Sequence, residues 1–319
     1  MPFSAIVGHE RIVGILRRSL TARRIAHAYL FDGIDGCGKR TTALALVEAA
    51  FCNGVDGCGT CAACRRIADL QHPDLHLLEP DGAFIKIEQV RDLQRQLSLR
   101  PYEAPFKACI IEAADRFHPA AGNALLKTLE EPPGNALMIL LTAHPDAVLP
   151  TIRSRCQAIR FPALPEETVS HFLASRDFPQ ETARLAASLA GGSLGRALEL
   201  CSGEELESRK ELIRLLSSLS LQEIGPLFAA AERLAGDKEQ VLSLIDLLTA
   251  FLRDILLLQG GSDEVVNLDL KELIEQEAAR LTPERVMQLI GHAISARRAL
   301  QRNTNTRLTL DILFMRLAA

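Results

Sequence analysis

The sequence predicts an α/β domain with a parallel, doubly wound sheet, followed by helical domains. Over the first 165 residues, short apolar runs alternate with segments of helical spacing, as in strands joined by crossover helices. After Phe161-Pro162 the strand signals stop and helical periodicity takes over. The 319 residues suffice for two or three domains. We expect an α/β domain over residues 1–165, a small helical domain over 166–208 and a larger helical domain over 209–319.

The predicted strands are short apolar runs, as expected for a parallel sheet that is buried on both faces. The helices between them show helical spacing, for example at Val90, Leu93 and Leu97. The last of these helices stops at Pro132-Pro133. The predicted strands are residues 28–32, 108–111 and 137–142, and the predicted helices are residues 41–51, 87–99 and 123–131.

The second half of the chain predicts helices only. Residues 166–200 show short helices with a break at Gly191-Gly192, and residues from 209 onward are mostly helical. One long helix carries an apolar stripe and ends at a loop over residues 259–262, where two glycines are paired. The stripe consists of Val241, Leu244, Ile245, Leu248, Leu252, Ile255 and Leu256.

The charge balance argues against a free-standing nucleic-acid binder, which usually carries a strongly basic domain. The chain has 36 Lys and Arg against 40 Asp and Glu, a net charge of −4. The acidic surplus lies in residues 166–319, which favours protein contacts over phosphate contacts there. The N-terminus does not have the pattern of a signal peptide, and no apolar run approaches the roughly 18 residues of a membrane span. We therefore expect a cytoplasmic protein without a membrane segment.

A glycine-rich segment, GIDGCGK at residues 33–39, follows the first strand and precedes a helix. This is the context of the phosphate-binding loop G-x-x-x-x-G-K-[ST], in which backbone N–H groups surround the phosphates and the lysine reaches the terminal ones. The last position of the pattern is Arg40, where a Ser or Thr would ligate magnesium. Thr41 comes one residue late, about 100° further round the helix. The candidate contacts to ATP or ADP are Gly33, Gly36, Gly38, Lys39, Arg40 and Thr41; a turn that binds no ligand is the alternative.

The strand at residues 108–111 lacks the acidic pair that completes a hydrolytic site, an Asp that orders magnesium and a Glu that activates water. Glu112 stands at the Asp position and Ala113 at the Glu position, and an alanine cannot activate water. Two separate parts of the hydrolytic machinery are therefore missing. For Glu112 and Asp115, solvated carboxylates at a strand end are the alternative to a metal role.

Four of the eight cysteines lie within 13 residues, directly after the predicted helix at 41–51. The spacing of Cys52, Cys58, Cys61 and Cys64 suits tetrahedral thiolate coordination of a structural zinc ion, and the loop that carries them is rich in Gly and Asn. A redox or disulfide cluster is the alternative, and an iron–sulfur cluster is another. The isolated Cys37, Cys109, Cys156 and Cys201 are expected to be packing residues.

With these residues in view, nearly the whole chain resembles the clamp-loader subunits of bacterial DNA polymerase III, members of the AAA+ family, and among them the delta-prime family. The gamma/tau family is the nearest competitor, but it keeps an intact Gly-Lys-Thr/Ser loop and an Asp-Glu strand end. The motifs that carry the resemblance are HAYLF at residues 27–31, HPDL at 72–75, IKIEQVR at 85–91, NALLKTLEEPP at 123–133, TIRSRC at 151–156 and RNTN at 302–305.

The resemblance implies that Arg155, from the Ser-Arg-Cys motif, points into the ATP site of a neighbouring subunit as an arginine finger. It also implies a polar residue near the γ-phosphate position at Thr142, and it places Gly195 where ATP-hydrolysing relatives carry an arginine. The implied protein is a stator with little or no ATPase of its own. Its partners would be gamma/tau and delta subunits, with the sliding clamp and primed DNA reached through the assembly. In that family residues 166–208 would form a lid and residues 209–319 an oligomerising collar.

Three alternatives remain open from the sequence. The first is an autonomous ATPase of the gamma/tau type. The second is a regulatory subunit that binds nucleotide without hydrolysing it. The third is a pure scaffold in which Arg155 has no chemical role.

Overall fold

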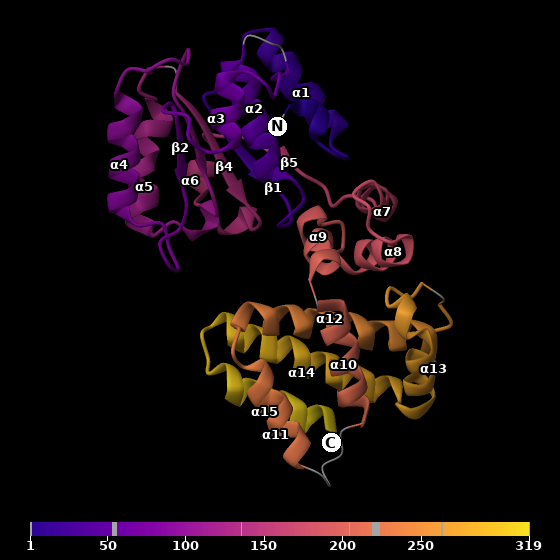
Figure 1. Ribbon diagram of the computed structural model, residues 1–319. Coiled ribbons are helices and arrows are strands. Elements are labelled where there is room, and N and C mark those ends of the chain that lie inside the picture. Colours follow the sequence, from indigo (N-terminus) through magenta and orange to yellow (C-terminus); the bar gives the residue numbers. More distant parts are fainter. Residues whose placement is uncertain are drawn as a thin grey trace. The chain divides into compact units, whose positions relative to one another are not determined.

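The computed structural model describes residues 2–52, 56–134, 136–203, 205–218, 224–262 and 264–318 (Figure 1). It divides into two compact units, Met1–Phe172 with Gly192–Arg196, and Leu173–Gly191 with Ala197–Ala319. Within the described ranges, we find no helix with the length and apolar character needed to cross a membrane.

The first unit is built on a parallel sheet that has five strands among the described residues, in the order β2-β3-β4-β1-β5. All four pairings are parallel, for example Ala28 beside Met138 and Asp32 beside Arg160. The carboxyl ends of all the strands therefore meet at one edge of the sheet. The strands are β1 (Ala28–Asp32), β2 (Leu75–Leu78), β3 (Ala108–Ile111), β4 (Leu137–Thr142) and β5 (Gln157–Arg160).

Helices cover both faces of this sheet, which confirms the doubly wound arrangement (Figure 1). Along β1, Tyr29 and Phe31 enter the core shared with α1 and α2, whereas Ala28 and Leu30 enter the core shared with α4 and α5. This alternation explains why β1 is apolar at every position except its last. The helices up to the last strand are α1 (Glu10–Thr21), α2 (Lys39–Phe51), α3 (Ala62–Ala68), α4 (Ile87–Ser98), α5 (Pro119–Glu130) and α6 (Pro150–Arg153).

The strands predicted at residues 28–32, 108–111 and 137–142 are confirmed at those bounds. The helix predicted to start at residue 123 begins four residues earlier, because the His118 side chain caps its N-terminus and Pro119 is compatible with the first helical position. The short strands β2 and β5 were not predicted. They are the two outermost strands of the sheet and are partly exposed, so their sequences lack a continuous apolar run.

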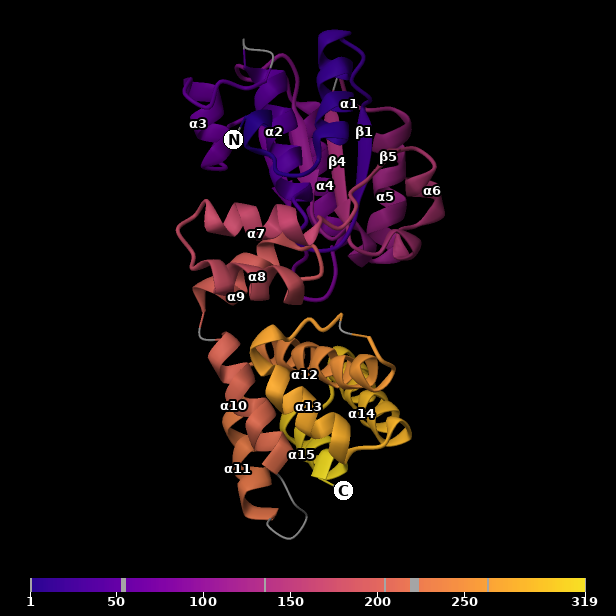
Figure 2. The same cartoon turned by 90° about the vertical axis from the view of Figure 1, so that its right-hand side faces the viewer.

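The second unit is helical, and its core lies between α10, α11 and the four helices from α12 to α15 (Figure 2). The apolar stripe predicted for α12 is buried, apart from the half-buried Leu256, and the helix ends at Gln259 as expected. The helices after the sheet are α7 (Glu166–Ala174), α8 (Gln180–Leu189), α9 (Leu194–Ser202), α10 (Glu205–Ser218), α11 (Ile224–Leu234), α12 (Lys238–Gln259), α13 (Lys271–Arg280), α14 (Pro283–Gln301) and α15 (Thr306–Ala318).

A buried polar network joins three segments of this helical core. The carboxylate of Asp254, on α12, accepts hydrogen bonds from the backbone N–H groups of Val266 and Asn267 at 2.9 and 2.7 Å. The guanidinium of Arg209, on α10, is fully buried and donates to the side chains of Asn267 and Asp269. Buried charges are tolerated when they are paired in this way, so the network fixes the loop before α13 against α10 and α12.

Asp74 performs a similar task in the first unit, just before β2. Its buried carboxylate accepts hydrogen bonds from the N–H groups of Tyr102, Glu103 and Ala104 at 2.7 to 2.9 Å. Burial by itself would raise the pKa of Asp74, but these three hydrogen bonds and the nearby Lys107 ammonium outweigh it and hold the pKa below its usual value. The Asp of the HPDL segment therefore ties the loop before β3 to the start of β2.

We expect Asp74→Asn to lower the free energy of unfolding by roughly 2 kcal/mol near neutral pH, because the amide nitrogen cannot accept these hydrogen bonds. The folded state lowers the pKa of Asp74. Its stabilising contribution is therefore complete above the unfolded pKa and is lost as pH falls through the folded pKa. Urea unfolding of both proteins at about pH 7 and about pH 3 should show the difference in stability narrowing at the lower pH.

The control is Asp81→Asn, which changes an exposed carboxylate paired with Lys86 and should have little effect at either pH. If wild type and Asp74→Asn differed in free energy of unfolding by the same amount at both pH values, this account would be contradicted.

Candidate functional site

The glycine-rich loop connects β1 to α2 at the carboxyl edge of the sheet, as a phosphate-binding loop does. Gly36 and Gly38 have φ values of 73° and 107°, a region that other residues enter at a cost. The Lys39 side chain is nearly buried and folds back on the loop, where its Nζ donates to the carbonyl oxygens of Gly33 and Ile34 at 2.7 and 2.9 Å. The ammonium that would meet phosphate is therefore held by the loop itself.

Arg40 stands where the motif would place a magnesium ligand, and its side chain reaches two strand ends. Its Nη1 donates a hydrogen bond to Glu79 Oε1 at 3.1 Å and forms an ion pair with Glu112 Oε1 at 3.0 Å. Glu79 follows β2 and Glu112 follows β3. Thr41 lies half-buried in the first turn of α2, and the hydroxyl of the next residue, Thr42, bonds to the Gly38 carbonyl.

The carboxyl ends of β3 and β4 complete this edge. Burial raises the pKa of Glu112, and the neighbouring Arg40 charge opposes that shift. The Thr142 hydroxyl donates to Asp115 Oδ1 at 2.6 Å and accepts from the His144 N–H at 3.0 Å. Ala113, at the position where a water-activating Glu is needed, offers no such group.

Two further segments contact the loop from outside the motif. The His9 Nε2 lies 2.7 Å from the Cys37 carbonyl oxygen, and the His9 ring packs edge-on against Phe161. The N–H of Gly195, at the start of α9, donates to the Gly36 carbonyl at 2.9 Å. A Cβ added at Gly195 would lie 3.0 Å from the Gly36 Cα, so this contact depends on the absence of a side chain at residue 195.

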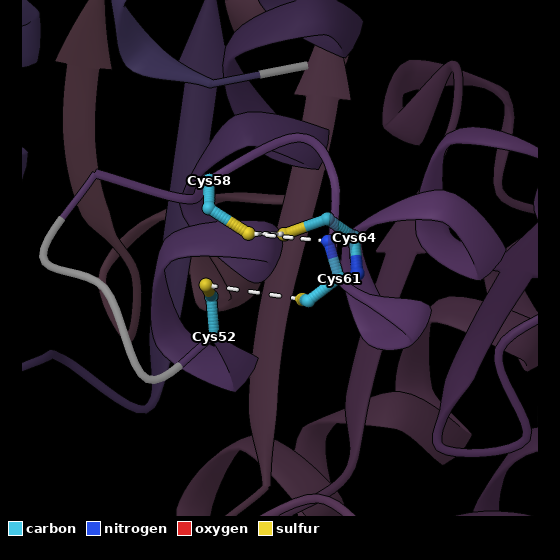
Figure 3. A group of neighbouring side chains, drawn as sticks. All are labelled: Cys52, Cys58, Cys61 and Cys64. Carbon is cyan, nitrogen blue, oxygen red and sulfur yellow. Dashed lines mark hydrogen bonds between the residues drawn. The ribbon is translucent and has the colours of Figure 1, made fainter.

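The four clustered cysteines converge on one point between α2 and α3 (Figure 3). Their four Sγ atoms all lie within 4.8 Å of one another, with Cys58 to Cys64 at 3.9 Å and Cys52 to Cys61 at 4.0 Å. A tetrahedral zinc site with Zn–S bonds of about 2.3 Å has sulfur–sulfur edges of about 3.8 Å. The spacing fits a metal ion held by four thiolates and is too wide for disulfide bonds.

The surroundings of the sulfurs also suit a metal ion. The backbone N–H groups of Cys61 and Cys64 donate to the sulfurs of Cys58 and Cys61 at 3.2 and 3.4 Å. Hydrogen bonds from Thr60 first, and then from Cys61, lower the pKa of Cys58 to about 5. Burial raises the pKa of Cys64 to about 12, so the cluster ionises fully only where a cation compensates the charge.

Arg155 lies at the opposite edge of the sheet, where the strands begin. It follows α6 and precedes β5, so it stands at the amino end of β5, whereas the phosphate-binding loop follows the carboxyl end of β1. The three residue steps from Gln157 to Arg160 alone span about 10 Å. The Arg155 guanidinium forms an ion pair with Glu130, at the end of α5, and donates to the Thr151 carbonyl at 3.0 Å.

The structure thus collects Gly33, Gly36, Gly38, Lys39, Arg40 and Thr142 at one edge, the four cysteines beside α2, and Arg155 at the opposite edge. Sequence reasoning missed Glu79, His9 and Glu130. The acidic residue directly after the LHLL run was a usable signal for Glu79. His9 and Glu130 carried no local signal, because their partners come from distant segments.

Comparisons with known proteins agree on one family. A family model described as DNA polymerase III, delta subunit, matches residues 8–165, and one described as the C-terminal part of that subunit matches residues 203–317. The DNA polymerase III subunit delta' of Bacillus subtilis is 34% identical over 314 residues, which cover 96% of this chain and 95% of that protein. The Escherichia coli subunit delta' is 30% identical over 308 residues, covering 94% and 91%.

Two further relatives are consistent with this family assignment. The tau subunit of Salmonella typhimurium is 34% identical over 257 residues, which cover 76% of this chain but 40% of tau. A solved structure of a gamma-subunit-related protein of Thermotoga maritima is 18% identical, has a TM-score of 0.50 and covers 96% of this chain and 98% of its own, which supports the fold. The chain therefore belongs to the delta-prime family of bacterial DNA polymerase III subunits.

Proposed function

We propose that this chain is a stator of a sliding-clamp loader and that it supplies Arg155 to the ATP site of a neighbouring subunit. The observation that carries this proposal is the place of Arg155 at the amino edge of the sheet, away from the chain's own phosphate-binding loop. From that position the guanidinium does not reach the chain's own phosphate-binding loop, so a phosphate that it contacts would belong to another subunit. Its rigid fork of donors suits γ-phosphate oxygens, and such an arginine supplied in trans contributes about 10³-fold or more to phosphoryl transfer.

The partners of the proposed assembly are gamma/tau and delta subunits, and through them the sliding clamp and primed DNA. The names of the relatives support the gamma/tau part of this set, since they are subunits delta', tau and gamma/tau of DNA polymerase III. We place the assembly in the cytoplasm. The chain's own ATPase activity is negligible in this proposal, because Arg40 replaces a magnesium ligand and Ala113 replaces the residue that activates water.

We propose that residues 166–208 act as a small lid and residues 209–319 as a collar that joins the chain to its neighbours. Helices α14 and α15, which pack against each other, together expose five large apolar side chains. Apolar surface of this kind is typical of protein contacts. The exposed side chains are Met287, Ile294, Leu308, Ile312 and Met315.

We also propose that Cys52, Cys58, Cys61 and Cys64 hold a structural zinc ion. Four sulfur ligands leave no open coordination position, so the ion would have no part in the chemistry of the loader. Its effect would be to join the end of α2 to the start of α3.

In a loader reconstituted from this chain and its partner subunits, we expect Arg155→Ala to abolish most of the ATP turnover at the one site that it faces. Single-turnover hydrolysis in the presence of clamp and primed DNA is the measurement. The matched control is Arg153→Ala, two residues earlier, which removes an exposed arginine paired with Asp146.

Unchanged hydrolysis in the Arg155→Ala loader would leave the chain as a scaffold only. Hydrolysis by the isolated chain, lost in Lys39→Ala, would instead identify an autonomous ATPase of the gamma/tau type.

We expect Leu308→Asp to weaken assembly of the loader at least tenfold, because it places a charge in an apolar interface. Leu308 is 59% exposed, so the fold of the isolated chain should tolerate the change. Analytical gel filtration and a binding titration with the partner subunits would measure the effect. Leu268→Asp, at a residue 52% exposed on a different segment, is the control and should assemble normally.

Metal analysis of the purified chain should find about one zinc ion per molecule, and Cys61→Ser should remove it and lower the melting temperature. Cys201→Ser, at a cysteine outside the cluster, should keep both the zinc and the melting temperature. Less than about half an equivalent of zinc in the wild-type chain would contradict a closed four-cysteine site.

A further inference from the structure

The residues of the phosphate-binding loop do not fit a magnesium-bound nucleotide. In a P-loop ATPase a Ser or Thr hydroxyl and a strand-end carboxylate hold magnesium beside the phosphates. Here the hydroxyl is replaced by the Arg40 guanidinium, and that guanidinium already contacts the strand-end carboxylate, Glu112, at 3.0 Å. A dication in the same place would compete with this positive charge for the same carboxylate.

The Arg40 charge is balanced as a metal charge would be. Its Nη1 contacts one carboxylate oxygen from Glu79 and one from Glu112, so two anionic groups converge on a single cationic nitrogen. These carboxylates follow two neighbouring strands, β2 and β3, while Arg40 lies in the first turn of α2. The contact thereby joins three elements at the carboxyl edge of the sheet, as a bound metal ion would.

Other polar groups of the site also have partners within the chain. Lys39 Nζ binds the Gly33 and Ile34 carbonyls and lies 3.5 Å from Asp35 Oδ1, and the Thr142 hydroxyl donates to Asp115. From the side of α9, the Gly195 N–H binds the Gly36 carbonyl directly.

We propose that Arg40 is a built-in cation in the magnesium position, and that with Glu79 and Glu112 it holds the loop and the strand ends in one conformation without any nucleotide. The inference rests on the stator function proposed above and deepens it. A metal ion and a nucleotide exchange with solution, so a site that needs them changes shape as they come and go. A guanidinium attached to α2 cannot leave, and arginine stays charged at any physiological pH.

The test uses the purified, zinc-loaded full chain and Arg40→Ser, which restores the G-K-S pattern and leaves Glu79 and Glu112 without their cation. We expect Arg40→Ser to melt about 2–4 °C below wild type and to recover in millimolar Mg²⁺ or Mn²⁺ but not in NaCl of equal ionic strength. Mn²⁺ titration followed by electron paramagnetic resonance should count about one additional ion per chain in Arg40→Ser relative to wild type.

Three further variants separate this proposal from a general charge effect. Arg40→Lys keeps a cation and should show no response to divalent ions. The double variant Arg40→Ser with Glu112→Gln lacks one carboxylate and should lose the gained response. Arg95→Ser removes an exposed arginine paired with Asp92 on α4 and should behave as wild type.

Magnesium-dependent binding of ATP to the wild-type chain would overturn the proposal, as would a gain in Mn²⁺ binding no larger in Arg40→Ser than in Arg95→Ser. If Arg40→Ser does not fold, the wild-type and Arg40→Lys titrations decide, and a bound Mn²⁺ at this edge in either one would overturn it. These outcomes do not depend on the role of Arg155, which is tested by ATP hydrolysis in the assembled loader.

Discussion

The common direction of the strands is the constraint on which the rest of this structure depends. Because all four strand pairings are parallel, residues that follow the strands gather at one edge, and residues that precede them gather at the other. The phosphate-binding loop, Glu79, Glu112 and Thr142 therefore meet at the carboxyl edge, while Arg155 and Glu130 meet at the amino edge. One chain thus carries the phosphate-binding loop at one edge and Arg155 at the other.

The two edges of the sheet differ in how their charges are used. At the carboxyl edge, Lys39, Arg40 and Thr142 all have partners within the chain, and Arg40 contacts two carboxylates. At the amino edge, Arg155 is about one-third exposed and its partner Glu130 is half-exposed. Arg155 has this one carboxylate partner, which in the proposed stator it would exchange for a phosphate of the neighbouring subunit. A rigid body with one exchangeable arginine is what a stator requires.

Long loops beside the sheet are held by polar anchors, because loops contribute little to the apolar core. Asp74 binds three consecutive N–H groups of the loop before β3, and the four cysteines gather the loop between α2 and α3. In the helical unit Asp254 and Arg209 do the same for the loop before α13. Asp74, Asp254 and Arg209 are buried charges, and their burial is favourable only with a full set of partners.

The sequence by itself determined the features that are encoded within short stretches of chain. The strands β1, β3 and β4 are almost wholly buried, so their apolar runs were readable, and the glycine loop and the cysteine cluster follow from spacing alone. The tertiary structure decided which residues Arg40 and Arg155 contact. The acidic hydrogen-bond partner of Arg40, Glu79, lies 39 residues away, and that of Arg155, Glu130, lies 25 residues away. Only the order of the strands brings such residues together, and that order depends on packing across the whole sheet.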